Sequence, residues 1–222
     1  MKFIQILFGQ PMIKPIKSGK KKQTRRAVKG DALKWLSGRD FPPEITDPIF
    51  KLCPFGQPGD VLWAREAWGK IDDVIVYKAD DPTLNEFINL KWKPGIHMKK
   101  EYCRTFLRIK SIRIERYLDI TEKDAIAEGI EKIREVQKSD FQYKWKDYLE
   151  VEAYKGQFEN NLMTGCEYPV QSFMSLWSSI YGAGAKSENP WLWVIEFERI
   201  DRPEGFLNDN NIALETTNSI SI

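Results

Sequence analysis

The densest group of side chains capable of chemistry lies near the start of the chain. Eight basic residues fall in one short stretch: Lys14, Lys17, Lys20, Lys21, Lys22, Arg25, Arg26 and Lys29. Such a run either forms a basic face that binds phosphates or is a solvated surface without a ligand. Close cations and partial burial both lower the pKa of a lysine, so a lysine within this run has the conditions needed to act as a base.

Composition narrows the class of protein. The 222 residues include 34 Lys and Arg against 32 Asp and Glu, so the charge of the whole chain does not indicate a polyanion partner. A hydrophobic share of 42% excludes wholesale disorder and suits one generous domain. No apolar run reaches the about 18–20 residues that span a bilayer, and no signal-peptide cleavage site follows the start. We therefore expect a cytoplasmic protein without membrane contact.

Cysteine usage gives no sign of a cross-linked or metal-stabilised fold. Cys53, Cys103 and Cys166 lie far apart, and His97 is the single histidine. This spacing argues against a disulfide framework and against a structural zinc site. We expect small, buried or half-exposed thiols.

Short strands and helices alternate in the first half of the chain. We expect a helix that begins at Pro11 and ends at Gly19, and strands at 3–8, 61–66, 74–78, 92–98 and 104–116. Within the last of these strands, the apolar positions change parity, which predicts a bulge near Ser111. Bends of this kind help a sheet to curl into a barrel.

The second half predicts two helices and a closing strand. Thr121 and Asp124 form a capping-box-like start for a helix that stops at Gly129. Apolar residues at i, i+3, i+4, i+7 and i+8 over 173–181 form one helix stripe, which we interpret as core. The segment WLWVIEFERI at 191–200 predicts a half-buried strand.

These elements predict an α+β fold, a small mixed β-barrel with helices between its strands. Residues 1–202 form this domain. Residues 131–169 are charged and aromatic without a clear period, and we interpret them as an inserted, partly helical segment. Residues 203–222 are expected to be a flexible C-terminal tail.

The order of four motifs resembles the ASCH family, whose members have a PUA-like β-barrel, and in particular the ASCH proteins of bacteriophages and prophages. The motifs are GKKKQTRR (19–26), PGD (58–60), DAIAEG (124–129) and WVIEF (193–197). The resemblance covers most of residues 1–200, apart from the insertion. Many ASCH domains carry Glu where this chain has Thr24. Threonine makes the chain similar to the bacterial N4-acetylcytidine amidohydrolases, which are much shorter.

This resemblance implies a catalytic set of Lys21, Thr24 and Glu128 that acts without a metal or a cofactor. Thr24 is expected to attack the acyl carbonyl, Lys21 to take its proton, and Glu128 to orient Lys21 or protonate the departing amine. Lys21 and Thr24 point to opposite faces of an extended segment, so their pairing requires a turn between them. The residues expected to contact the substrate are Gly19, Arg26, Trp63, Arg65 and His97.

Structural roles compete with each of these functional ones. Lys21 also suits a solvated lysine, Thr24 a turn hydroxyl and Glu128 a surface helix position. Arg26 serves equally as a salt-bridge partner or as a clamp for a pyrimidine carbonyl or phosphate. Tryptophans in strands are usually core, and a strand histidine is more often a hydrogen-bonded wall residue than a catalyst.

Three functions therefore stay open for the expected partner, which is a modified nucleoside or a nucleic-acid strand. The first is hydrolysis of the amide of N4-acylated cytidine. The second is a non-catalytic module, or a ribonuclease, that grips RNA or single-stranded DNA with the basic run. The third is a phage accessory protein in which the pocket serves only as scaffold.

Overall fold

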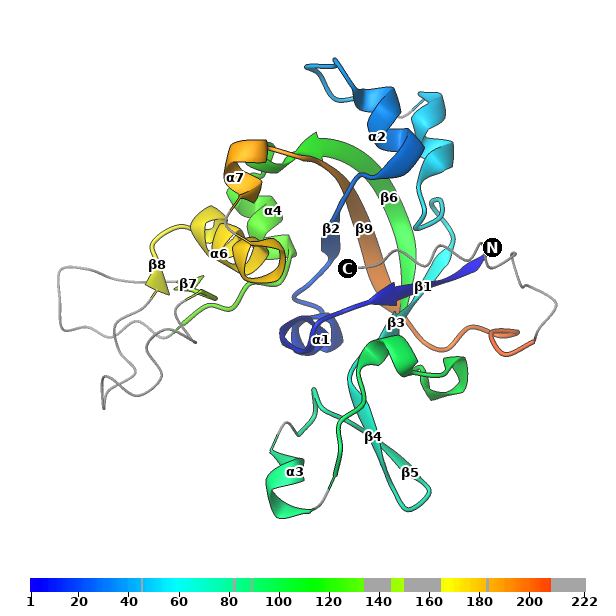
Figure 1. Cartoon of the computed structure of the whole chain (residues 1–222). Helices are drawn as coiled ribbons and strands as arrows, with labels where there is room; N and C mark the ends of the chain where they lie inside the picture. Colours follow the sequence, from blue (N-terminus) through cyan, green and yellow to red (C-terminus); the bar gives the residue numbers. More distant parts are fainter. Residues whose placement is uncertain are drawn as a thin grey trace.

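The computed structural model of the chain describes residues 1–44, 46–81, 83–88, 90–133, 145–149, 165–182 and 184–208. Its central element is one curved, mixed sheet (Figure 1). The sheet has five strands, β1 (Phe3–Leu7), β2 (Gln23–Ala27), β3 (Val61–Arg65), β6 (Phe106–Arg116) and β9 (Trp191–Ile200). Their order is β1-β3-β6-β9-β2, with β1 and β3 parallel and the other neighbours antiparallel.

The backbone ladder of this sheet does not close into a barrel. β1 and β2 are its two edges, and Figure 1 shows the arch of β6 and β9 bringing them to the same side. A side chain joins the edges, because Nη2 of Arg26 in β2 donates to the carbonyl of Leu7 at the end of β1, at 2.8 Å. The predicted α+β class is confirmed, whereas the predicted barrel is an open, curved sheet.

The predicted bulge lies in the longest strand. The pairing of β6 with β9 shifts register between Ile109 and Ser111. The shift keeps Ile109, Ile112 and Ile114 buried at 2% exposure each, although a regular strand would place the first and the other two on opposite faces. The parity change in the sequence thus marks the bend of the arch.

Short helices connect the strands. They are α1 (Gln10–Lys17), α2 (Gly30–Leu36), α3 (Leu84–Phe87), α4 (Glu122–Ala127), α6 (Pro169–Tyr181) and α7 (Ala185–Glu188). The predicted signals hold for α1 and α4: Pro11 occupies the first turn of α1, and Thr121 accepts a hydrogen bond from the backbone N–H of Asp124. Among the described helices, none is both long enough and apolar enough to cross a membrane.

The remaining elements are small. Four 3-10 helices are η1 (Pro48–Leu52), η2 (Gly95–His97), η3 (Lys100–Tyr102) and η4 (Tyr117–Asp119). Strands β4 (Trp68–Ile71) and β5 (Val74–Tyr77) form an antiparallel hairpin, and β7 (Trp145–Lys146) pairs with β8 (Gly165–Cys166). The latter two strands lie in the expected insertion, where 134–144 and 150–164 fall outside the described residues.

The predicted strand at 92–98 is wrong. A single bridge joins Trp68 to Lys93, and η2 follows at once. Pro94 has no backbone N–H to donate to a ladder. Gly95 packs close to Glu66, since a Cβ at 95 would lie 3.1 Å from the Glu66 backbone, and it begins η2 instead of continuing a strand.

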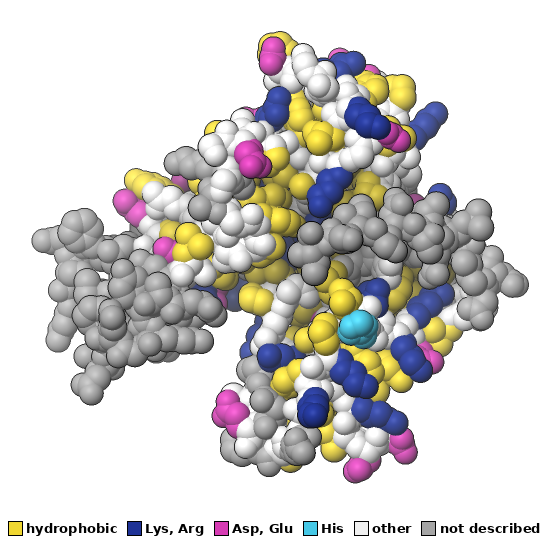
Figure 2. Space-filling view, viewed as in Figure 1, with side chains coloured by type: hydrophobic (Ala, Val, Ile, Leu, Met, Phe, Trp, Pro, Cys, Tyr) yellow, Lys and Arg dark blue, Asp and Glu magenta, His cyan; other side chains and the backbone are white. Residues whose placement is uncertain are grey.

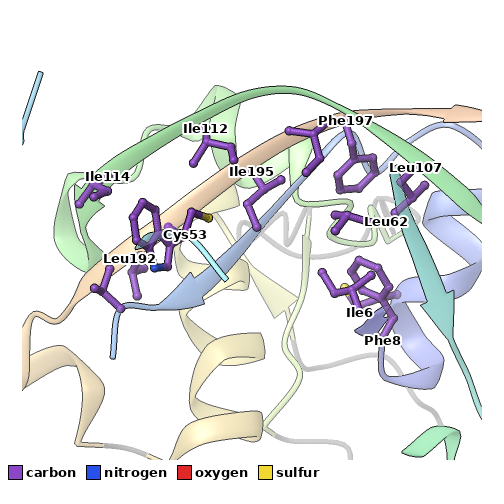
Figure 3. Packing of buried hydrophobic residues seen from close by; sticks show 14 of the residues in the cluster. Ile6, Phe8, Cys53, Leu62, Leu107, Ile112, Ile114, Leu192, Ile195 and Phe197 are labelled. Atoms are coloured by element: carbon purple, nitrogen blue, oxygen red, sulfur yellow. The ribbon is translucent and has the colours of Figure 1, made fainter. Parts of the chain in front are cut away.

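The closing strand is also more buried than predicted. β9 is buried at every position from Trp191 to Ile195, on both faces, because its first half is apolar without alternation. The main core lies beneath the β6–β9 arch, where Phe197 lies on the side of Leu62 of β3 and Ile6 of β1, and Ile112 and Ile195 lie on the side of Cys53 (Figure 3). Cys53, Cys103 and Cys166 are all buried, as the sequence led us to expect of small thiols.

A second, smaller cluster packs around Phe206, which is 1% exposed. Its ring contacts those of Phe3, Trp63 and Phe106 at centroid distances of 5.3, 6.0 and 4.7 Å. We expected a flexible tail from residue 203. The structure describes 203–208, and the folded region extends at least to Phe206, while 209–222 lie outside the described residues.

Candidate functional site

Lys21 and Glu128 meet in the interior of the protein. Nζ of Lys21 donates to Oε2 of Glu128 at 2.6 Å and to the backbone carbonyl of the same residue at 2.7 Å. Their side chains are only 2% and 4% exposed. Burial lowers the pKa of Lys21, and the Arg25 and Arg26 guanidiniums lower it further, while the Glu128 carboxylate opposes these effects.

The turn after α1 and the end of α4 bring this pair together. Lys22 N–H donates to the carbonyl of Ala127 at 2.8 Å, and Lys21 N–H donates to that of Pro15 at 3.0 Å. Gly129, at φ +80°, passes directly against Lys21. The sequence signals for both helix ends therefore also build the site, because Gly19 ends α1 just before Lys21, and Gly129 follows Glu128.

Glu128 binds a second buried cation. Nη1 of Arg25 donates to Oε1 of Glu128 at 3.1 Å, and Nη2 of Arg25 donates to Oε2 of Glu115 at 2.8 Å. The Arg25 side chain is fully buried. One carboxylate thus lies between an ammonium and a guanidinium, so its negative charge has more than one compensating partner.

Thr24 occupies a neighbouring position on β2 and is 1% exposed. Its Oγ1 accepts a hydrogen bond of 2.8 Å from Nη1 of Arg26. Among the described residues, its hydroxyl has no hydrogen bond with Lys21 or Glu128. Arg26 is nevertheless electrostatically coupled to both, since Arg26 lowers the pKa of Lys21, and Glu128 counteracts the lowering of the Arg26 pKa by burial.

Arg26 therefore connects the parts of the candidate site. It binds the Thr24 hydroxyl and the Leu7 carbonyl, and its guanidinium lies 5.1 Å from the centroid of the Phe8 ring. Tyr181 at the end of α6 also interacts electrostatically with it. This placement makes Arg26 the hydrogen-bond partner of the Thr24 hydroxyl.

Of the other residues expected to contact substrate, Trp63, Arg65 and His97 lie away from Lys21. Trp63 and Arg65 are on the face of β3 opposite Leu62, next to the Phe206 cluster, whereas Thr24 pairs with the core residue Ile195. Arg65 donates to the carbonyl of Gly95 at 3.0 Å and to Gln5 at 2.7 Å. His97 is exposed in η2, rather than in the strand where it was expected. Gly19 alone of this set lies near Lys21.

A cleft of about 730 Å³ borders the Lys21 segment. Its walls come from the turn before β2, from α4 and from β6 and β9, and its lining includes Gly19, Lys21, Gln23, Asp124 and Phe197. Neither Thr24, Arg26 nor Glu128 lines it. The cleft therefore reaches Lys21 but not the Thr24 hydroxyl.

The N-terminal basic run does not form one exposed face. Lys21 and Arg25 are buried in ion pairs, Arg26 is half-buried, and Lys17 pairs with Asp80 at 2.7 Å. The exposed members are Lys14, Lys20, Lys22 and Lys29. Half of the cations thus serve internal contacts, which charge counting along the sequence cannot reveal.

Sequence reasoning missed the role of Arg25 and Glu115. Arg25 was counted only as part of the charged run, although it pairs with three carboxylates: Glu115 at 2.8 Å, Asp124 at 3.6 Å and Glu128 at 3.1 Å. The available signal was its alternation with Gln23 on β2, which places both side chains toward α4.

Comparison of the chain with protein-family models, with curated proteins and with solved structures found no match.

Proposed function

We propose that the protein is an ASCH-type amidohydrolase with a PUA-like fold, and that it removes the acyl group from N4-acylated cytidine or a closely related acylated nucleobase. The contact between Lys21 and Glu128, residues 107 positions apart, is the observation that carries the proposal. This contact places a buried lysine, whose pKa is lowered, beside a carboxylate. The Thr24 hydroxyl is bound by Arg26, which also lowers the pKa of Lys21. The choice of nucleobase comes from the motif resemblance.

The chemistry begins at Thr24. Lys21, as the neutral amine, takes the hydroxyl proton, and the Thr24 oxygen attacks the acyl carbonyl carbon. The bond from that carbon to N4 breaks as the Lys21 ammonium returns the proton to the departing amine. Water then attacks the acyl carbon, with Lys21 again taking the proton. The bond from that carbon to Oγ1 of Thr24 breaks as the Lys21 ammonium returns the proton to Oγ1, and the products are the nucleobase amine and a carboxylic acid.

Arg26 and Glu128 support opposite stages of this reaction. Because Arg26 donates to Oγ1 of Thr24, its positive charge stabilises the alkoxide and leaves the hydroxyl proton free for transfer. Glu128 binds the Lys21 ammonium that forms after proton transfer. Proton transfer requires the Lys21 side chain to turn from Glu128 toward Thr24. A nucleoside or nucleic-acid substrate also suits a cytoplasmic location.

The direct test is incubation of the purified protein with N4-acetylcytidine and separation of the products by liquid chromatography. Thr24→Val removes the hydroxyl but keeps the side-chain shape, so we expect cytidine release to be lost. Thr105→Val is the matched control, because Thr105 is also a fully buried threonine and its hydroxyl has no partner in the described residues. We expect Lys21→Met to lower kcat by about 10²–10⁴-fold.

The outcome against the proposal is equally clear. If the native protein releases no cytidine above the Thr24→Val background, or if Thr24→Val and Thr105→Val retain equal activity, the Lys21–Glu128 pair is a structural ion pair. Unfolding curves of each variant keep the two explanations apart, since a folded Thr24→Val protein without activity has lost chemistry rather than structure.

A further inference from the structure

A second set of cations lies on the surface formed by 91–104, β3 and the residues after β9. Residues 91–104 carry Lys91, Lys93, Lys99, Lys100 and Arg104 against one acid, Glu101. Figure 2 shows Lys and Arg side chains gathered near His97, which is the cyan side chain. We call the group Lys93, Lys99, Lys100, Arg65 and Arg202 the aromatic-backed basic face.

Each of these cations lies over an aromatic ring. Lys100 and Arg202 share the Phe206 ring, at 5.0 and 5.6 Å from its centroid. Lys93 lies 4.8 Å from Trp68, Lys99 5.7 Å from Tyr102, and Arg65 5.7 Å from Trp63. An aromatic ring attracts a cation above its face but carries no net charge, so the positive charge of the cation is not neutralised.

The rings themselves are held firmly. The rings of Trp68 and Tyr102 lie tilted against each other with centroids 4.9 Å apart, and Phe206 contacts Trp63, so the cations lie on the small second core. Side chains fixed by packing lose less conformational freedom when a ligand binds. The face is therefore organised before any partner arrives.

Carboxylates leave most of this charge uncompensated. Within the described residues, Lys93, Lys100 and Arg202 form no ion pair with an acid. Lys99 has a long and exposed contact of 3.5 Å with Glu101. In the N-terminal basic run, by contrast, Lys21 and Arg25 are buried and paired with carboxylates.

From these contacts we infer that the aromatic-backed basic face binds the phosphate backbone of a single-stranded nucleic acid. Uncompensated cations bind phosphates through release of counterions. Trp63 and Tyr102 are only partly buried, so the accessible part of each side chain can contact unpaired bases of the strand. This inference deepens the proposed function, because it makes the substrate a nucleotide within a strand. The acylated base itself rests on the proposed function.

The experiment measures fluorescence anisotropy of a labelled single-stranded oligouridine RNA over a range of salt concentrations. The variant K93Q/K100Q/R202Q removes three uncompensated cations of the face. K14Q/K29Q/K51Q is the matched control, because it removes as many charges from exposed lysines elsewhere. A third variant, K93R/K100R/R202K, keeps the charge on the face.

We expect the first variant to reduce the slope of log affinity against log salt by about 2, since each phosphate contact on a single strand contributes about 0.7. The control and the charge-preserving variant should keep the slope of the native protein. Equal losses in the first variant and in the control would overturn the inference, as would stronger binding to duplex RNA or to polyglutamate than to the single strand.

This readout is independent of hydrolysis. Lys93, Lys100 and Arg202 lie outside the Lys21–Thr24 site, so K93Q/K100Q/R202Q should release cytidine from free N4-acetylcytidine as the native protein does. If the native protein binds the RNA but does not hydrolyse N4-acetylcytidine, the proposed function is refuted and the inference about the aromatic-backed basic face stands. Intact hydrolysis without any RNA binding would refute the face alone.

Discussion

Gly129 lies so close to Lys21 that a Cβ atom at position 129 would be 2.6 Å from the Cβ of Lys21. The same atom would lie 2.8 Å from the Pro15 Cβ, and Gly129 has a φ of +80°. The helix stop that the sequence predicted is therefore also the place where the two halves of the site touch. A side chain at this position has no room on either side.

We predict that Gly129→Ala lowers the free energy of unfolding by about 2–4 kcal/mol, from the combined cost of the left-handed conformation and the close contact. Gly59→Ala is the control, because Gly59 has a φ of +92° but open space around it. Chemical denaturation of both variants separates conformational strain from crowding. Equal losses would contradict the tight approach at Gly129.

The lowered pKa of Lys21 predicts a specific dependence of stability on pH. In the folded protein Lys21 gives up its proton at a lower pH than in the unfolded chain, where the ordinary value is 10.5. Between these two pKa values the unfolded state binds more protons, so this residue makes the protein more stable as pH rises through the window. The effect ends once the pH passes 10.5.

Denaturation curves from neutral pH to about pH 10, compared between the native protein and Lys21→Met, measure this contribution. The stability difference should shift in favour of the native protein as the pH rises. Lys34→Met, at an exposed lysine whose side chain is 80% accessible, should show no such trend. A constant difference at Lys21 would mean that its ammonium stays charged throughout.

Arg104 and the buried Glu66 form an ion pair apart from the Lys21–Glu128–Arg25 group, and we expect it to be structural. Nε and Nη2 of Arg104 donate to the two Glu66 oxygens, both at 2.9 Å, and the Glu66 side chain is 1% exposed. Arg104→Met leaves this carboxylate buried without its cation, and we predict a loss of about 3–5 kcal/mol in unfolding free energy. Adding Glu66→Gln should restore part of it, a result that a double-mutant cycle measures.

Phe206 supplies a test of where the folded region ends. Its ring is 1% exposed against Phe3, Trp63 and Phe106, so Phe206→Ala should cost about 3–5 kcal/mol of stability. Leu207→Ala is the neighbouring control, because Leu207 is 47% exposed. Thermal unfolding of both variants makes the comparison, and a small effect at Phe206 would restore the expectation of a flexible tail from residue 203.

The sequence predicted most of what depends on local patterns. Apolar parity located the bulge at Ser111, and proline, glycine and threonine signals located the ends of α1 and α4. These features depend on neighbours along the chain, so a single sequence carries them. The strand predicted at 92–98 was wrong because its apolar residues suggested pairing, whereas Pro94 has no N–H to donate to a ladder and η2 begins at Gly95.

Long-range contacts set the limit for the site. The motif resemblance pointed to Lys21 and Glu128, and the structure brings them together. The hydrogen bond from Arg26 to Thr24 joins residues two positions apart on one face of a strand. The alternation of side chains along a strand could therefore have predicted it. The pairing of Arg25 with Glu115 depends on how β2, β6 and α4 meet, which no local pattern states.

The link between Arg26 and the Leu7 carbonyl gives the curved sheet a seam that carries no backbone ladder. The edges at β1 and β2 can separate there by giving up side-chain contacts alone, with every strand pair intact. Because the same guanidinium holds the Thr24 hydroxyl, a ligand that draws Arg26 away would open the seam and release that hydroxyl in one movement. Entry of the ligand and exposure of the Thr24 hydroxyl would then both depend on the position of Arg26.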